Sequence, residues 1–185
     1  PTGPRTGRMS SEAEIGAPLH VVPRLPWVRK MIKAPPGRKI VAGDFSQIEL
    51  RSIAGIANEF TMQALYREGE DLHAATAGMI LAMGETKGQI TVSDYWKERH
   101  VWMAKVTKLD RDGAKGANFG LAYGMQAEKL QTYAKQSYKV HLTIDQARTM
   151  REGYFKLYSR ILPWHEEIMH EARRGYVETP WGRRI

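Results

Sequence analysis

The sequence contains no cysteine, which excludes disulfide bonds and thiolate metal sites. It has no apolar run approaching the roughly 20 residues of a membrane-spanning helix, and no secretory signal peptide is visible. We therefore expect no membrane partner. The P-loop pattern Gly-x-x-x-x-Gly-Lys-Ser/Thr is also missing, which argues against a P-loop phosphotransferase.

The charge balance, in contrast, is strongly one-sided. The 185 residues carry a net charge of +8, and the pI is about 9.7. Such an excess predicts polyanionic partners, with nucleic acid ahead of acidic membrane. A basic chain with five tryptophans could be a catalytically inactive module that binds single-stranded or primer-template DNA by base stacking. That alternative predicts salt-sensitive DNA binding that is indifferent to Mg²⁺.

The stretch from Asp44 to Arg51 stands between two different patterns. The β-branched pair Ile40 and Val41 predicts a strand over 38–43, and apolar residues at helical spacing follow the stretch. Asp44 would then end a strand just before a helix amino terminus, a favourable place for a metal or phosphate site. Residues 46–49 also fit a capping box, which is a purely structural role.

A second group of residues is spaced by four: Arg111, Lys115, Phe119 and Tyr123. On a helix they form one slightly spiralling stripe. A buried face would not align two cations with two rings unless acidic partners were present, and a plain solvated face would not carry the rings. The stripe suits a nucleoside triphosphate, with cations toward phosphates and rings toward base and sugar. Three glycines in the same helix, at 113, 116 and 120, predict close approach of another backbone or a ligand, or a bend.

Both stretches resemble motifs of one family. Asp44-Phe45-Ser46-Gln47-Ile48-Glu49-Leu50-Arg51 resembles the first catalytic motif of family A DNA polymerases, the DNA polymerase I type. Arg111-x-x-x-Lys115-x-x-Asn118-Phe119-Gly120-x-x-Tyr123-Gly124 resembles the second motif. Residues 6–11, 69–76, 153–155 and 175–184 are similar to further family segments, and the clearest gaps are 15–25 and 84–105.

The resemblance implies a mixed α/β, helix-rich fold: part of the palm β-sheet plus the helical fingers subdomain of a right-hand polymerase. We expect a palm portion over 1–60, fingers over 61–160 and a return segment toward the palm over 161–185. Because the chain starts at Pro1 and stops after Ile185, we expect a piece of a longer protein.

The implied activity is DNA-directed DNA polymerase, in phage or bacterial DNA replication or repair and in the cytoplasm, with primer-template DNA and dNTPs as partners. Asp44 would bind two Mg²⁺ ions with the Phe45 carbonyl, and Lys115 would also donate a proton to pyrophosphate. The implied dNTP-binding residues are Arg111, Lys115, Phe119, Tyr123, Glu49, Gln47 and His73. The implied DNA-binding residues are Arg8, Arg51, Arg183 and Arg184.

One part of that chemistry is missing from the sequence. Two metals about 4 Å apart need more than one carboxylate, and the family's second, in a His-Asp-Glu-type motif, is absent. We therefore expect the isolated chain to bind nucleotide weakly and not to polymerise. The sequence identifies neither an exonuclease domain nor a processivity partner.

Several local patterns predict where helices begin. Asp71 can cap a helix to about residue 83, Ser93 one toward Lys108, and Thr143-Ile144-Asp145-Gln146 is a capping box. Further helices are expected over 61–68, 126–138 and from Pro163 to 175, with a strand over 176–179 and a loop over 84–91.

Overall fold

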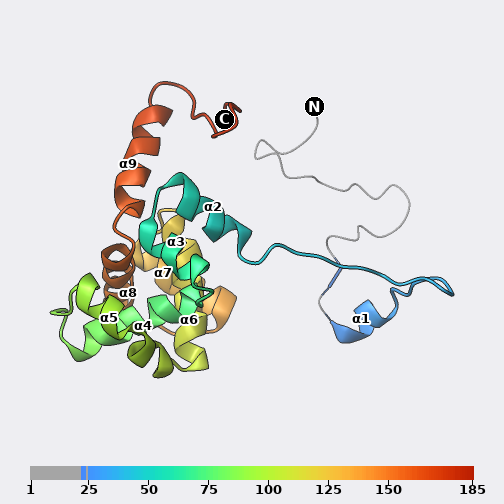
Figure 1. Ribbon diagram of the computed structural model, residues 1–185, viewed down its shortest axis with the longest axis horizontal. Helices are drawn as coiled ribbons and strands as arrows, with labels where there is room; N and C mark the ends of the chain where they lie inside the picture. Colours follow the sequence, from blue (N-terminus) through green and yellow to red (C-terminus); the bar gives the residue numbers. More distant parts are fainter. Residues whose placement is uncertain (1–21, 24) are drawn as a thin grey trace. The chain divides into compact units, whose positions relative to one another are not determined.

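The computed structural model describes residues 22, 23 and 25–185, so Arg8 and most of the first 24 residues lie outside the described part. The described chain divides into two compact units (Figure 1). One runs from Gln47 to Val177. The other comprises the described residues up to Ser46 together with Glu178–Ile185. Each unit is described by itself.

The larger unit consists of helices. They are α2 (Ile48–Ile56), α3 (Phe60–Arg67), α4 (Leu72–Glu85), α5 (Val92–Ala104), α6 (Lys108–Ala122), α7 (Ala127–Tyr133), the π-helix η2 (Ala134–Tyr138), α8 (Ile144–Leu157) and α9 (Ile161–Ala172). Outside this unit, α1 (Pro26–Lys30) is a single short helix.

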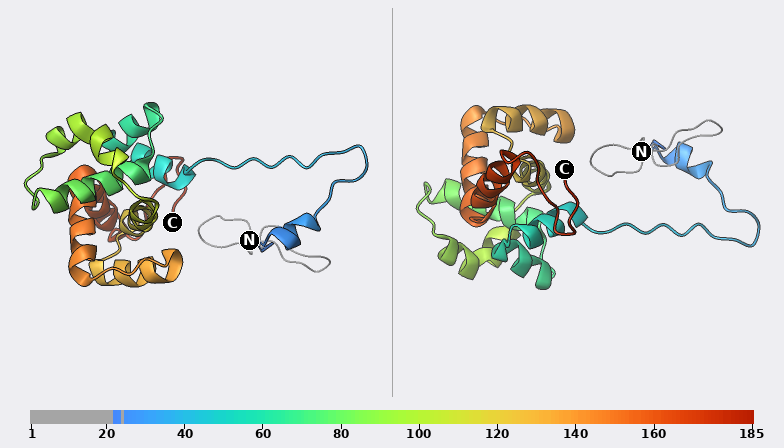
Figure 2. Two further views of the ribbon diagram at one scale, coloured as in Figure 1. Left: turned by 90° about the horizontal axis from the view of Figure 1, so that it is seen from below. Right: turned by 90° about the horizontal axis from the view of Figure 1, so that it is seen from above.

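Helix α4 is the centre of the larger unit and packs against α5, α6 and α8 (Figures 1 and 2). Its buried residues occur around its whole circumference rather than on one stripe, as expected of a helix with neighbours on all sides. The core around it is built from alanine, leucine, methionine and tyrosine side chains. Burial of this apolar surface is the main force that holds the helices together.

Helix α5 lies in the stretch that the family pattern left unexplained. It approaches α4 closely at Gly78, where a Cβ would lie 3.0 Å from the Tyr95 hydroxyl and 3.3 Å from the Met103 backbone nitrogen. The buried Tyr95 hydroxyl donates a hydrogen bond to the Ala75 carbonyl at 2.5 Å. Residues 84–105 therefore contribute to the core.

Helix starts follow the predicted capping chemistry at two places, α4 and α8, and a third cap at α6 was not predicted. The Asp71 side chain accepts the His73 and Ala74 amides at the start of α4. Thr143 and Gln146 form the predicted capping box of α8, and Thr107 with Asp110 forms another at α6. The cap of α5 is Thr91 rather than Ser93. Helix α4 extends into the predicted loop, and α9 begins at Ile161, two residues before Pro163.

Three local predictions are wrong. Ser46 does not cap α2, because Gln47 occupies the N-cap position in a left-handed conformation and provides no side-chain cap. Residues 38–43 are not a strand, and no strand occurs in the part of the chain that is described. Residues 176–179 contribute only an isolated bridge between Glu178 and Arg184. The helix-rich half of the fold prediction thus agrees with the structure, and the palm-sheet half is not confirmed by residues 22, 23 and 25–185.

The physical reason for the missing strand is the lack of a partner. A strand is stable only when its backbone pairs with neighbours and one face is covered. Within its unit Val41 is 92 % exposed, and Ile40 and Phe45 are also exposed. The β-branched residues that predicted the strand thus have no sheet to join among the described residues.

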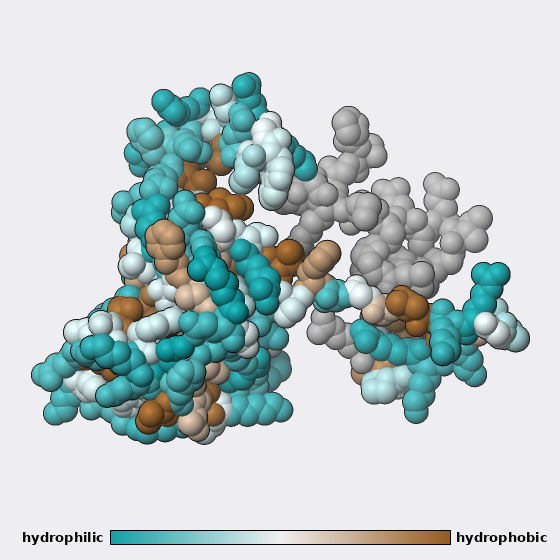
Figure 3. Space-filling model, in the orientation of Figure 1, coloured by the Kyte–Doolittle hydropathy of each residue, from teal (hydrophilic) through white to brown (hydrophobic). Residues whose placement is uncertain are grey.

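Polar residues cover most of the visible face of the helical unit, with hydrophobic residues in small groups (Figure 3). Among the described residues, no helix combines the length and apolar character that crossing a bilayer requires.

Candidate nucleotide-binding face

The predicted stripe lies on the open side of α6. Arg111, Lys115 and Phe119 are half-buried, and Tyr123, directly after the helix, is 66 % exposed. Nearly all the residues between them are buried. At Gly120 a Cβ would lie 2.9 Å from Met125 Sδ, so the close neighbour of this glycine is a side chain rather than the predicted backbone or ligand. Helix α6 therefore packs through its small residues and leaves cations and rings accessible.

Arg111 is held by the cap of the neighbouring helix. Its Nε donates to Asp71 Oδ2 at 2.6 Å, and Asp71 Oδ1 accepts the His73 amide at 2.9 Å. Partial burial acts to raise the pKa of Asp71. The hydrogen bond and charge of Arg111, with the two amide hydrogen bonds, outweigh it and lower that pKa below its usual 3.8. The ion pair links the start of α4 to the first turn of α6.

His73 lies in the first turn of α4, beside the stripe. Its ring centroid is 6.1 Å from that of Phe119, and the residue is only 2 % exposed. Burial lowers the pKa of His73 to about 4; the Asp71 charge opposes this shift, and the Arg111 and Lys115 charges add to it. The imidazole is therefore neutral at physiological pH.

A buried polar network behind His73 was not predicted as part of the site. Asn118 Nδ2 is 2.8 Å from His73 Nδ1, and Thr76 Oγ1 donates to Asn118 Oδ1 at 2.9 Å. The Tyr158 hydroxyl lies 2.9 Å from Thr76 Oγ1. The spacing of His73 and Thr76, one helical turn apart, was the only local sign that they share a face.

A second predicted group gathers at the start of α2 and the end of α6. The Tyr123 hydroxyl donates to Glu49 Oε2 at 3.3 Å. The Tyr66 hydroxyl donates to Gln47 Oε1 at 3.0 Å, and Arg51 stacks 4.2 Å above the Tyr66 ring. Burial raises the pKa of Tyr66 to about 12, so the phenol stays protonated as a donor.

The remaining predicted residues belong to the other unit or lie outside the described residues. Asp44 and Phe45 are exposed and directly precede the helical unit, and Arg183 and Arg184 are exposed in the last residues. Arg184 Nε lies 3.5 Å from Glu178 Oε2. In the described ranges no cluster of three or more histidine or acidic side chains could hold a metal ion.

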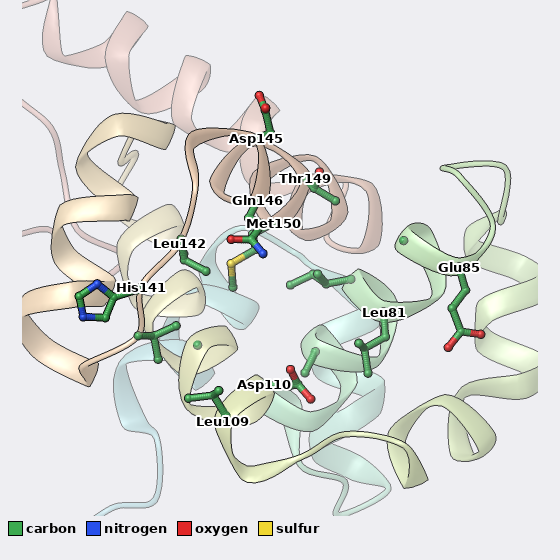
Figure 4. Close-up of a pocket in the computed structure, with 15 residues that line it drawn as sticks. Leu81, Glu85, Leu109, Asp110, His141, Leu142, Asp145, Gln146, Thr149 and Met150 are labelled. Atoms are coloured by element: carbon green, nitrogen blue, oxygen red, sulfur yellow. The ribbon is translucent and has the colours of Figure 1, made fainter.

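Helix α6 also borders a mostly apolar cleft of about 620 Å³, between α4, α6 and α8 (Figure 4). Leu81 and Glu85 come from α4, Leu109 and Asp110 from α6. None of the predicted nucleotide-binding side chains lines this cleft. The stripe and the cleft are thus separate features of one helix.

Comparison with known proteins decides the family. The model for "DNA polymerase family A" matches residues 1–185, the whole chain. The chain belongs to DNA polymerase family A. Similar relatives of this family are DNA polymerase I of Aquifex aeolicus, 34 % identical over 99 % of this chain, and the thermostable DNA polymerase I of Thermus aquaticus, 32 % identical over 99 %. The DNA polymerase of Mycobacterium phage D29 is 32 % identical over 100 % of the chain.

This family A chain spans only part of its relatives, 28 % of the Aquifex protein, 19 % of the Thermus protein and 26 % of the phage protein. A similar solved structure is the polymerase domain of Pol1 from M. smegmatis, in complex with DNA primer-template and dNTP. The likeness has a TM-score of 0.55 and 27 % identity, and it covers 76 % of this chain and 21 % of that one.

Proposed function

We propose that this chain is the palm-edge and fingers part of a DNA-directed DNA polymerase, which extends a primer 3′ end with dNTPs in DNA replication or repair. The observation that carries the proposal is the stripe of two cations and two rings on the open side of α6, in a chain of this family. The similar Pol1 structure, which holds primer-template and dNTP, supports the same partners.

In this proposal the stripe binds the incoming nucleotide along its length. Lys115 places a point charge at the triphosphate. Arg111 uses one of its five N–H donors on Asp71 and keeps the others for phosphate oxygens. Phe119 packs against the sugar. Tyr123, hydrogen-bonded to Glu49, closes the 2′ side of the sugar and disfavours ribonucleotides.

Metal binding falls to Asp44. An exposed carboxylate and the neighbouring Phe45 carbonyl are oxygen ligands of the kind that Mg²⁺ prefers. They fit part of a two-metal site, which needs a further carboxylate that the described residues do not gather. When bound, Mg²⁺ would activate the primer hydroxyl and neutralise charge on the phosphates. Lys115 would donate a proton to pyrophosphate as the primer oxygen displaces it from the α-phosphate.

The domain assignment follows from this proposal. Residues 1–60 form the palm edge, where 38–43 would pair with strands from outside the described residues. Residues 61–160 form the fingers, and 161–185 return toward the palm. DNA contacts would come from Arg8, Arg51, Arg183 and Arg184, all cations that suit a phosphate backbone.

A primer-extension assay tests the activity. The complete natural protein that contains this chain is expected to extend a primer with Mg²⁺ and four dNTPs, and Asp44→Ala is expected to abolish extension. The 185-residue chain alone is expected not to extend, because one candidate carboxylate cannot hold two metals. Robust extension by the chain alone would overturn this account of the metal site.

The rival function is a DNA-binding module without catalysis, which the net charge of +8 favours. It predicts DNA binding that weakens with salt but ignores both Mg²⁺ and Asp44→Ala. If the complete protein binds DNA in this way but does not extend a primer, the DNA-binding function replaces the polymerase proposal.

A further inference from the structure

The network behind His73 is a chain of hydrogen bonds between two helices and the residue that follows α8. Tyr158, Thr76 and Asn118 are fully buried, and His73 is nearly so. The links are 2.9 Å from Tyr158 to Thr76, 2.9 Å from Thr76 to Asn118 and 2.8 Å from Asn118 to His73. The chain ends at Nδ1 of the imidazole that borders the stripe.

The Thr76 hydroxyl lies 2.9 Å from both the Leu72 carbonyl oxygen and Asn118 Oδ1, so its single proton is shared between these two acceptors. With its carbonyl oxygen accepting from Thr76, Asn118 presents its NH₂ group to His73, and an amide NH₂ only donates. Nδ1 of a neutral imidazole must then be the acceptor, so the ring proton lies on Nε2. The opposite orientation of the amide would move the ring proton to Nδ1 and leave Nε2 as a bare acceptor.

The other ring nitrogen is the one open to a ligand. Nε2 of His73 makes no hydrogen bond to any described residue. It is also not among the three side-chain nitrogen and oxygen atoms that are buried in the described chain without a partner. The charges of Arg111 and Lys115 reach the imidazole, since both lower its pKa. Beside these cations, an N–H on Nε2 complements a phosphate oxygen, whereas a lone pair would repel it.

We propose that Asn118 is a positioning residue that holds His73 in the Nε2–H tautomer, so that His73 offers a neutral N–H donor to a phosphate oxygen of the incoming nucleoside triphosphate. This rests on the proposed nucleotide-binding function. His73 thereby adds direction to a site where Arg111 and Lys115 add charge. Thr76 contacts the carbonyl end of the Asn118 amide, and Tyr158 contacts only Thr76.

The tautomer is measured directly by two-bond ¹H–¹⁵N correlation spectra of the complete natural protein labelled with ¹⁵N-histidine. The His73→Gln variant identifies the His73 signals. The expected wild-type pattern shows an unprotonated Nδ1 and a protonated Nε2, and Tyr158→Phe is expected to keep it. A proton on Nδ1 in the wild type would overturn the proposal, whatever the variants do.

The near-isosteric Asn118→Asp replaces the donor by an acceptor. The carboxylate is expected to pull the ring proton onto Nδ1, giving the other neutral tautomer, in which Nε2 has no proton to donate. An unchanged spectrum in Asn118→Asp would contradict the positioning role.

Single-nucleotide incorporation separates positioning from plain structural support. A hydrogen bond to a charged group contributes about 1.5–3 kcal/mol, so Asn118→Asp is expected to lower kcat/KM for dNTP by about 10- to 100-fold. In a His73→Gln background the same change is expected to have little further effect, because its route is already removed. Equal losses in both backgrounds would mean that Asn118 acts without His73. Absence of incorporation by the wild type would remove the phosphate role and the proposed function, while the spectrum still decides the tautomer.

Discussion

Asp71 uses its two carboxylate oxygens for different purposes. Oδ1 caps α4 and Oδ2 pairs with Arg111. Asparagine is as good an N-cap as aspartate, so Asp71→Asn keeps the cap and removes the charge. We expect the free energy of unfolding to fall by less than about 1 kcal/mol in Asp71→Asn, because the pair is partly exposed. In Asp71→Ala it should fall by about 1 kcal/mol more.

Urea unfolding followed by circular dichroism measures both Asp71 variants. The depressed pKa of Asp71 means that its ionic contribution is present above the unfolded value of 3.8 and is lost as the pH falls. Asp71→Asn should lack that acid-dependent loss. An equal loss of unfolding free energy in Asp71→Asn and Asp71→Ala would show that the charge of Asp71 stabilises the fold and that its cap does not.

The buried His73 imidazole also makes the stability of the fold depend on pH, and here too stability falls as the pH drops. Its pKa is about 4 in the folded chain against an ordinary value of 6.5, so the unfolded chain binds more protons between these values. Stability should be unaffected by this group above pH 6.5, fall as the pH drops toward 4, and lose nothing further below. In His73→Gln, the free energy of unfolding should no longer fall between pH 6.5 and pH 4 because of this group. An unchanged profile would show that His73 titrates normally when folded.

At the scale of single residues, the sequence predicted which side chains share a helix face better than it predicted which residues they contact. The stripe on α6 was predicted because cations and rings at a spacing of four suit neither a core nor a plain surface. The partner of Arg111 and the amide behind His73 were not predicted, because Asp71 and Asn118 come from sequence positions 40 and 45 residues away. Only the packing of α4 on α6 brings them together.

Two glycines of α4 offer a matched test of helix packing. A Cβ at Gly78 would meet α5 backbone atoms at 3.3 and 3.4 Å, whereas a Cβ at Gly84 would meet nothing within 4 Å. Gly78→Ala should destabilise by about 1–3 kcal/mol through overpacking. Gly84→Ala should stabilise by up to about 1 kcal/mol through helix propensity. Thermal unfolding distinguishes them, and equal effects of one sign would refute the close approach of α5.

Helices were predictable and strands were not, for a physical reason. Caps such as Asp71 and Thr143 act within one turn, so a local pattern contains what they need. A strand depends on a neighbour that can be distant in sequence or in another segment. The pattern at 38–43 indicated a strand, yet the described residues supply no partner for it.

Across the whole molecule, the predicted chemistry divides between the two units. The helical unit holds the residues proposed for the nucleotide, and Asp44 belongs to the other unit. The model of the family matches the entire chain, yet the chain covers only 28 % of the length of the Aquifex relative. The placement of the candidate nucleotide-binding residues on one helix could therefore be predicted from sequence, whereas the assembly of the metal site could not.

The central claim is that the α6 stripe binds the incoming nucleotide, and the dNTP dependence of single-nucleotide incorporation tests it most directly. The complete natural protein, Lys115→Ala and the control Lys97→Ala are compared; Lys97 is an exposed cation on α5, 3.7 Å from Asp94. We predict that Lys115→Ala lowers kcat/KM by about 100-fold or more and that Lys97→Ala changes it little. Equal kcat/KM values for the two variants would contradict the claim.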